Sequence, residues 1–421
     1  MGTIEPMRFV TRYSSQAIAA VLLLVLGMML QNRYAVLQRA QILLNQTTSI
    51  QSGGSGNQVK PVSPDSIDLS VFWEAWSYVQ SDYLDPAKID PKTMVDGATA
   101  GMVASLGDPY TMYLPPDDNK RSSEDLAGAF FGVGIELGYK DKILAVVAPL
   151  PDSPAALAGV EAGDLILKVA DENNPDGEDS QNWSLDKAVD KIRGPRGTPV
   201  TLTLYRESHG NQPFEVTINR GEIVVKSVTL EFVENAGKTY AHIGISRFGE
   251  RTKTEWDDVV TEITAHQPGV SGIVLDLRNN PGGFFDGAIQ VASDFIPSGV
   301  VVSQKGKFVD QDYDSIGTGR LAKYQTEVLV NGGSASASEI VAGALRDRIG
   351  SKLIGTQTFG KGTVQDRRDL SNGGGLHVTI ARWLLPGGDW IQDEGIPVTI
   401  EVKPDPDATT DQVLDRALKE F

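Results

Sequence analysis

The chain of 421 residues contains no cysteine, and this absence removes several kinds of chemistry at once. Disulfide bonds, thiolate zinc sites and a cysteine nucleophile are excluded. A bacterial lipoprotein anchor is excluded too, because its lipid is attached to a cysteine. Any nucleophile must therefore be sought among other side chains.

Histidine and net positive charge are also scarce. The four histidines (His209, His242, His266 and His377) form no HExxH or similar ligand pair, so we expect neither a metal ion nor another cofactor. The 38 basic and 55 acidic residues give a net charge of −17. A field of that sign repels phosphate backbones, which argues against nucleic acid as a partner.

Charge is missing altogether from residues 13–32, and Ile18–Leu30 is almost wholly apolar. Twenty residues at a rise of ~1.5 Å would span a hydrocarbon core of ~30 Å. A cleaved signal peptide is the alternative, but no small-x-small cleavage site follows Leu30. We expect residues 1–44 to form a cytoplasmic stub and an uncleaved transmembrane signal-anchor. It would cross a bacterial cell membrane once and leave the catalytic part on the extracytoplasmic side.

The chain is longer than one hydrophobic core usually serves, so we expect several domains. Residues 45–64 are polar and rich in glycine and serine, as in a flexible linker. Residues 65–127 should form an N-terminal helical segment, because apolar residues recur at helical spacing in 69–79 and 94–106. We expect the aromatic stripe of the first helix to be core, with a dimer surface as the alternative.

Residues 128–220 change to short strands and glycine turns, with an amphipathic helix at Leu185–Ile192. This arrangement, with its SPA…AG…GD-I pattern, resembles a PDZ domain. The resemblance implies that an extended peptide C-terminus adds as a strand beside the first sheet edge. Alternatively, the glycines only shape a strand turn. The candidate carboxylate loop, whose glycines allow bare N–H groups to converge, consists of Phe131, Gly132, Val133, Gly134 and Ile135.

Residues 221–421 alternate buried strands and helices, which predicts an α/β core. The fold class is therefore multi-domain α/β, with the β-rich domain inserted before this core. The expected strands are Tyr240–Ile245, Ile273–Leu277, Glu327–Val330, Lys352–Ile354, Thr363–Gln365 and Leu376–Trp383, and the expected helices are Trp256–His266, Ser338–Leu345 and Thr410–Glu420.

The first motif with chemical potential, GGSASASE, lies between an expected strand and an expected helix. Serines among glycines and alanines at a helix start place a hydroxyl on a tight turn with little steric cover. Free N–H groups and the positive end of the helix dipole then face any oxyanion that forms nearby. Helix N-capping is the alternative role. The residues alone do not choose among Ser334, Ser336 and Ser338.

The second motif, Gly355–Thr363, nearly matches a phosphate-binding loop. However, Gly362 stands where the magnesium-binding hydroxyl must be, and a strand follows in place of a helix, so we reject an NTPase. Lys361, flanked by glycines, can bury its amine; burial lowers the pKa of the amine and makes it a candidate base. Gln365 lies four residues on, and in a strand its amide would share a face with Lys361.

Together the two motifs and their surroundings, over residues 65–421, resemble the carboxyl-terminal processing (tail-specific) proteases, a family of Ser–Lys endopeptidases. The resemblance implies that Ser336 is the nucleophile, Lys361 the general base and Gln365 its partner. It also implies an oxyanion hole made by the N–H of Ala337 and that of Gly282 or Gly283. Arg193 resembles an arginine linked to substrate-dependent activation, with an ordinary surface cation as the alternative. Asp108–Leu114 resembles a structural segment of the family.

The implied function is a serine endopeptidase that cuts exported proteins at or near their C-termini through an acyl-enzyme. Its substrates would carry apolar, unstructured C-termini recognised by the PDZ domain, and the terminal helices invite a homodimer. Two alternatives remain. One is a catalytically inactive PDZ scaffold with a protease-like fold. The other is a Ser–His–Asp hydrolase of small esters, for which His377 would be the base.

Overall fold

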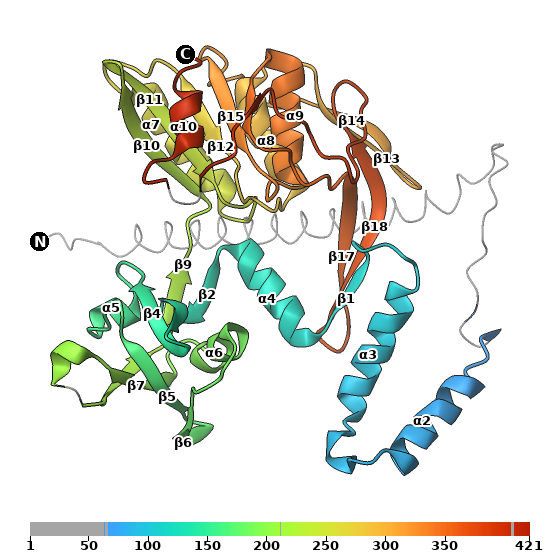
Figure 1. Ribbon diagram of the computed structural model, residues 1–421. Coiled ribbons are helices and arrows are strands. Elements are labelled where there is room, and N and C mark those ends of the chain that lie inside the picture. The colour runs from blue at the N-terminus through green and yellow to red at the C-terminus, as the bar shows by residue number, and fades with distance from the viewer. Residues whose placement is uncertain (1–62, 64–65, 211, 406–407) are drawn as a thin grey trace, which may run out of the picture. The chain divides into compact units, whose positions relative to one another are not determined.

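The computed structural model describes residues 63, 66–210, 212–405 and 408–421 (Figure 1). The expected membrane span at residues 13–32 lies outside these residues, as does nearly all of the expected linker. Within the described part of the chain, no helix is both long and apolar enough to cross a membrane. The chain divides into two compact units, residues 1–89 and 90–421.

In the first unit, helix α2 (Ser70–Asp82) is followed by the short 3-10 helix η2 (Pro86–Lys88). Helix α2 carries the expected aromatic stripe, and the rings of Phe72, Trp73 and Trp76 contact one another. None of the residues of α2 is buried. Within the first unit, the stripe is therefore exposed and does not form the core that its spacing suggested.

The second unit begins with helix α3 (Pro91–Ala104), whose N-terminus is capped by the Asp90 carboxylate. Strand β1 (Met112–Leu114) and helix α4 (Pro116–Ala127) follow. The sequence pattern did not predict β1, because its pairing partner, β18 (Gly375–Leu384), lies more than 250 residues further along the chain.

The β-rich region contains a six-stranded antiparallel sheet with the path β3-β4-β5-β7-β8 and β6 beside β5. Its core includes Leu144, Ile166, Leu202 and Leu204. Strand β3 lies at one end of this path, so one of its edges has no strand partner among the described residues. The bounds are β2 (Ala129–Gly132), β3 (Ile135–Lys140), β4 (Ile143–Pro149), α5 (Pro154–Leu157), β5 (Leu165–Asp171), β6 (Asn174–Asp179), α6 (Leu185–Ile192), β7 (Pro199–Tyr205), η3 (Glu207–His209), β8 (Phe214–Asn219) and β9 (Gly221–Val224); β2 pairs with β9.

The C-terminal region is built on a second six-stranded sheet, in the order β10-β11-β12-β15-β16-β19, which is parallel from β11 onwards. Alternate side chains of these strands point to opposite faces. One face packs against α7, α8 and α9, and the other packs against α10 (Figure 1). The bounds are β10 (Val228–Asn235), β11 (Lys238–Ile245), α7 (Thr252–Ala265), β12 (Ile273–Asp276), α8 (Phe285–Phe295), β15 (Thr326–Val330), α9 (Ala337–Ile349), β16 (Leu353–Gly355), β19 (Ile400–Glu401) and α10 (Gln412–Ala417).

A third sheet joins β13 (Val300–Gly306), β14 (Asp310–Asp314) and β17 (Thr363–Asp369) to β1 and β18. Strand β18 pairs with β1, β13 and β17, so it holds the lysine-bearing region against the segment before α4. The sequence pattern did not predict the hairpin of β13 and β14 or helix α8. The α/β class itself is confirmed.

Candidate active site

The three serines of the GGSASASE motif have different environments. Ser334 and Ser338 are fully buried, and their hydroxyls donate to backbone carbonyls, that of Ser334 to Leu277 (2.8 Å) and that of Ser338 to Asn280 (2.8 Å). Ser336 is half-buried, and no carbonyl of a described residue accepts its hydroxyl. Ser336 is therefore the serine whose hydroxyl can reach a ligand.

Ser336 also has an uncommon backbone. Its φ of 56° and ψ of −115° lie outside the regions that residues with side chains usually occupy, a conformation that only a well-determined surrounding can maintain. Helix α9 begins at the next residue, Ala337. The N–H groups of the first helical turn have no partner within a helix, so the one of Ala337 is available beside the Ser336 hydroxyl.

The turn after β12 lies directly against Ser336. A Cβ atom on Gly282, whose φ is +99°, would come within 2.9 Å of the Ser336 Cβ and 3.0 Å of the Ala337 nitrogen, so only glycine fits. The N–H of Gly282 donates to Asn280 Oδ1 (2.8 Å). Gly283 forms a parallel bridge with Phe248. The two hydrogen bonds of this bridge run from the N–H of Phe248 to the Gly282 carbonyl and from the N–H of Phe284 to the Phe248 carbonyl. Of these two glycines, Gly283 is therefore the one whose N–H has no acceptor among the described residues.

Lys361 lies in the loop between β16 and β17, where its amine is partly enclosed. Burial lowers the pKa of the Lys361 amine from its ordinary value, while the negative charges of Asp108 and Glu339 oppose this shift. The amine is 5.2 Å from the ring centre of Tyr110. Gly360 must be glycine, because its φ is +93° and a Cβ would lie 2.7 Å from the Gly395 nitrogen.

Gln365 is near Lys361 for a different reason from the one expected. Lys361 precedes β17, and the register with β18 shifts between Val364 and Gln365, so the two side chains do not share a regular strand face. The Gln365 amide donates to the hydroxyls of Thr363 (2.9 Å) and Thr379 (3.2 Å). Both donors are thereby used, which leaves the Gln365 amide oxygen as an acceptor.

A single cavity of about 470 Å³ brings the expected residues together. It is lined by Ser336, Ala337, Lys361, Gln365, Gly282 and Gly283. Apolar side chains, including Phe284, Phe285, Ile340 and Trp383, form much of the remaining wall. The cavity thus combines a reactive hydroxyl, an amine, backbone donors and an apolar surface.

His377 lines the same cavity but lacks the partner that a triad histidine needs. Its Nε2 atom is buried without a hydrogen-bond partner in the described structure, and no described carboxylate orients the ring. Burial, together with the charges of Arg367 and Lys361, lowers the pKa of His377. The arrangement does not support a Ser–His–Asp triad.

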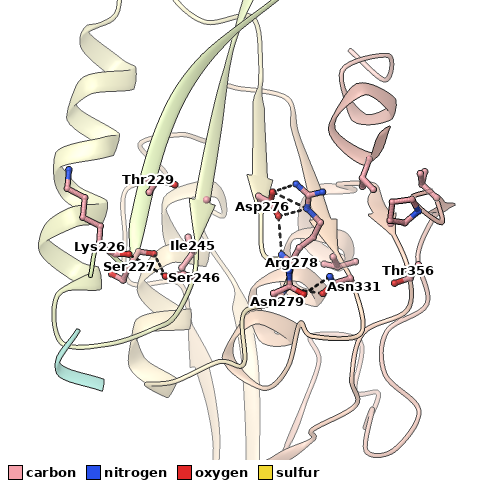
Figure 2. Close-up of a pocket in the computed structure, with 16 residues that line it drawn as sticks. Lys226, Ser227, Thr229, Ile245, Ser246, Asp276, Arg278, Asn279, Asn331 and Thr356 are labelled. Carbon is pink, nitrogen blue, oxygen red and sulfur yellow. Dashed lines mark hydrogen bonds and ion pairs between the residues drawn. The ribbon is translucent and has the colours of Figure 1, made fainter. Parts of the chain in front are cut away.

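A second cavity, of about 530 Å³, lies at the carboxyl ends of β11, β12, β15 and β16 and shares no lining residue with the first. Figure 2 shows its polar groups paired with one another. Arg278 donates to Asp276, and Asn331 donates to the side chain of Asn279 (2.9 Å). These pairs fix the two turns whose other side forms the first cavity.

The candidate carboxylate loop splits between elements. Phe131 and Gly132 belong to β2, which pairs with β9, whereas Val133 and Gly134 connect β2 to β3, which begins at Ile135. The carbonyls of Val133 and Gly134 accept backbone N–H groups of Ala155 and Leu150, respectively.

Arg193 is engaged by other side chains. Its guanidinium lies 3.9 Å from the ring centre of Phe130 and 3.4 Å from the Glu124 carboxylate of α4.

Three residues of the site were missed in the sequence. Glu339 is fully buried and accepts N–H groups from both motifs. Asn280 bridges the turns after β12 and β15, and Tyr110 covers the lysine amine. The spacing of Ser336 and Glu339 is that of a capping box and could have indicated Glu339; Tyr110 leaves no such signal.

The α/β core, the PDZ-like sheet and this cavity define a serine-type hydrolase with a peptide-binding module. Comparison with known proteins gives the family. Residues 239–402 match peptidase family S41, residues 146–206 match the PDZ domain, and residues 24–118 match the activating protease CtpB N-terminal domain. The chain belongs to the carboxyl-terminal processing proteases of peptidase family S41, which are serine-type peptidases.

Curated relatives agree. The chain is 36% identical over 331 residues to carboxy-terminal processing protease CtpA of Bacillus subtilis, covering 78% of this chain and 68% of the relative. It is 37% identical over 343 residues to the carboxy-terminal-processing protease of Bartonella bacilliformis, covering 80% and 75%. A CtpA-like serine protease of Staphylococcus haemolyticus is 39% identical over 329 residues, covering 76% of this chain but only 62% of that protein.

Among solved structures, a Bacteroides fragilis protein assigned to the S41 proteases has a TM-score of 0.52 and 19% identity. The match covers 83% of this chain and 96% of that one. This similarity shows the fold alone.

Proposed function

We propose that the chain is a Ser–Lys endopeptidase that cuts exported proteins at or near their C-termini. Lys361 takes the proton of the Ser336 hydroxyl as the oxygen bonds to a peptide carbonyl carbon. The oxyanion rests on the N–H groups of Ala337 and Gly283. The proton then passes to the leaving amine, the C–N bond breaks, and an acyl-enzyme remains. Water, deprotonated by Lys361, releases the second product and restores the Ser336 hydroxyl.

The observation that carries this proposal is the single cavity lined by Ser336, Lys361 and the backbone of the oxyanion turn. Of the three neighbouring serine hydroxyls, that of Ser336 is the one that donates to no carbonyl of a described residue. The lowered pKa of Lys361, caused first by burial, favours a neutral amine that can accept a proton. The Gln365 amide oxygen can hold that amine once it is positioned.

The PDZ domain would supply the substrate. An extended C-terminus can add beside β3, whose edge has no strand partner in the described sheet. The loop of Phe131, Gly132, Val133, Gly134 and Ile135 would hold the terminal carboxylate. We propose that Arg193, which joins the PDZ region to α4 through Glu124, relays substrate binding to the cavity, because α4 lines that cavity.

The proposal for the location rests on the sequence alone. We propose that residues 13–32 anchor the chain in the membrane and that the peptidase acts on the extracytoplasmic side. We also propose that the chain dimerises through its terminal helices. The exposed aromatic rings of α2 support this proposal.

The decisive test uses the full chain and an unfolded protein with an apolar C-terminus, with the products read by mass spectrometry. Ser336→Ala and Lys361→Ala should each lower the cleavage rate by about 10³-fold or more, because the two groups act as a unit. His377→Ala should retain turnover. Ser246→Ala, which changes an exposed serine of the second cavity, is the matched control and should cleave at the wild-type rate.

Labelling by a fluorophosphonate gives an independent measurement of the same pair. The probe should modify wild type at Ser336 and should fail on Lys361→Ala. Proteolysis that survives in carefully purified Ser336→Ala would remove the proposed mechanism, and a wild-type chain that neither cleaves nor labels would favour the inactive scaffold.

A further inference from the structure

Glu339 occupies an unusual position for a carboxylate. It lies in the first turn of α9 with no exposed surface, and no lysine or arginine of the described residues forms an ion pair with it. Four donors replace the cation. Its Oε2 accepts the N–H of Ser336 (2.7 Å) and that of Lys361 (3.0 Å). Its Oε1 accepts the N–H of Gly360 (2.7 Å) and the hydroxyl of Thr358 (2.6 Å).

These donors come from two segments that are separated along the sequence. Ser336 belongs to the turn after β15, whereas Lys361 and its neighbours belong to the loop after β16. One oxygen atom therefore bonds the backbones of both residues at once. A carboxylate that accepts several N–H groups is held in a single orientation, because each bond fixes a different direction.

The contact with Glu339 stabilises the strained backbone of Ser336. With a φ of 56° and a ψ of −115°, Ser336 stays in place only if its surroundings fix it. The bond from its N–H to Glu339 is the contact that does so on the α9 side. The same carboxylate fixes the entrance to the lysine loop through Gly360.

We propose that Glu339 is a positioning residue for the Ser336–Lys361 pair. By accepting the N–H groups of both residues with one oxygen, its carboxylate holds the nucleophile and the base at their working separation. This proposal rests on the proposed function, because it requires the two residues to react together. Glu339 itself does not touch the substrate.

The charge of Glu339 has a separate effect that makes the proposal testable. It raises the proton affinity of Lys361 and so opposes the effect of burial on the pKa of the amine. Removing the charge should therefore lower the pKa of Lys361 further. The other ionisable groups around the amine are Asp108 and Tyr110 from the segment before β1, and Asp125, Arg247, Glu250, Arg367 and His377 from the cavity wall.

Glu339→Gln separates position from fold. An amide has one acceptor oxygen, so in either orientation its NH₂ group faces one of the two pairs of donors, and at least one backbone N–H loses its acceptor. The kcat for the unfolded substrate should fall by about 10²-fold, the effect of a small displacement of reacting groups, with KM nearly unchanged. At the same time the acid limb of the pH profile for fluorophosphonate labelling should move to lower pH.

Two further variants complete the test. Glu339→Asp keeps the charge but shortens the reach, so its kcat should fall without the shift of the acid limb to lower pH. Glu255→Gln is the matched control, because Glu255 of α7 is also a largely buried carboxylate that accepts the N–H groups of Ser227 (2.7 Å) and Val228 (3.1 Å). It should lower the melting temperature while leaving kcat and the acid limb in place.

The outcomes divide cleanly. A Glu339→Gln chain with kcat within about threefold of wild type would overturn the proposal. So would a loss that only follows the melting temperature and leaves the acid limb unmoved, as in the control. If Glu339→Gln does not fold, wild-type kcat in Glu339→Asp would overturn it. A wild type that equals Ser336→Ala would instead defeat the proposed function.

Discussion

At the residue scale, the environment of Lys361 differs from that of a structural lysine, whose amine is held in an ion pair. Its amine faces the Tyr110 ring, and no described carboxylate forms an ion pair with it, although Asp108 and Glu339 are near enough to influence its charge. An ammonium group in such a place loses hydration that no partner replaces. Burial is therefore the largest cause of the lowered pKa of Lys361.

This environment predicts how reactivity depends on pH. In the proposed mechanism a neutral amine accepts the Ser336 proton, so the labelling rate should fall as the pH falls through the pKa of Lys361. Because that pKa is lowered, the midpoint should lie below the ordinary lysine value of 10.5. The measurement is the rate of fluorophosphonate labelling across the pH range in which the chain stays folded. Lys361→Arg, which keeps a cation but cannot give up its proton, should label at least 10³-fold more slowly. A midpoint at or above 10.5 would contradict this account.

Individual site residues also show what could be predicted from the sequence and what could not. Ser336 and Lys361 each lie in a compact motif, so the resemblance could propose them directly. Their difference from neighbouring residues could not be predicted, because the buried hydroxyls of Ser334 and Ser338 depend on carbonyls from the turn after β12. Glu339 was visible as a letter of the motif, but its contact with the lysine loop requires the fold.

At the element scale, the site exists because neighbouring parallel strands end at the same edge. The turn after β12 carries Gly283, and the turn after β15 carries Ser336; β12 and β15 pair directly. Ligand sites usually form outside the carboxyl ends of such strands. Asn280 joins the two turns: its carbonyl accepts the N–H of Ala335 and its side chain accepts that of Gly282.

The charged cluster at the end of β12 predicts a pH-dependent stability. Asp276 accepts hydrogen bonds from Arg278, contacts His242 and has its pKa lowered to about 2; these partners outweigh its burial. A lowered pKa contributes stability that is present above the unfolded value of 3.8 and is lost as the pH falls toward 2. Asp276→Asn should therefore lower the free energy of unfolding by on the order of 2 kcal/mol at pH 7, and by about half of that near pH 3.

Urea unfolding at a series of pH values measures this difference. Asp310→Asn is a suitable control, because the carboxylate of Asp310 is exposed and, among the described residues, forms an ion pair only with Lys305, so its removal should change little. A gap between wild type and Asp276→Asn that stays constant from pH 7 to pH 3 would rule out the ion pair as its cause.

Elements were predicted well where the pattern was local. The helix expected at Leu185–Ile192 has those bounds, and the parallel strands β11, β12, β15 and β16 differ from expectation by one or two residues, whereas β19 was not predicted. Strand β1 was missed because its three residues gain their structure from β18. The shared strand face of Lys361 and Gln365 was wrong, because β17 begins after the lysine and its register shifts at Gln365.

At the scale of the whole molecule, the proposed function assigns substrate capture and cleavage to different domains of one chain. The chain carries a net charge of −17, so its overall field repels the carboxylate of a substrate C-terminus. Capture must then depend on short-range contacts. Backbone N–H groups beside β3 can provide them, since hydrogen bonds to a charged group are stronger than those between neutral groups.

We therefore expect the full chain to distinguish a free C-terminus from a blocked one. A long unstructured peptide with an apolar C-terminus should be cleaved with a KM about tenfold or more lower than its C-terminal amide, because the amide lacks the charge that strengthens each hydrogen bond. The kcat should be similar, since the scissile bond is unchanged. Ile135→Glu places a negative charge at the start of β3 and should remove the difference by weakening capture of the free acid. Equal KM values for acid and amide in the wild-type chain would mean that the loop at residues 131–135 shapes a strand turn and does not bind the carboxylate.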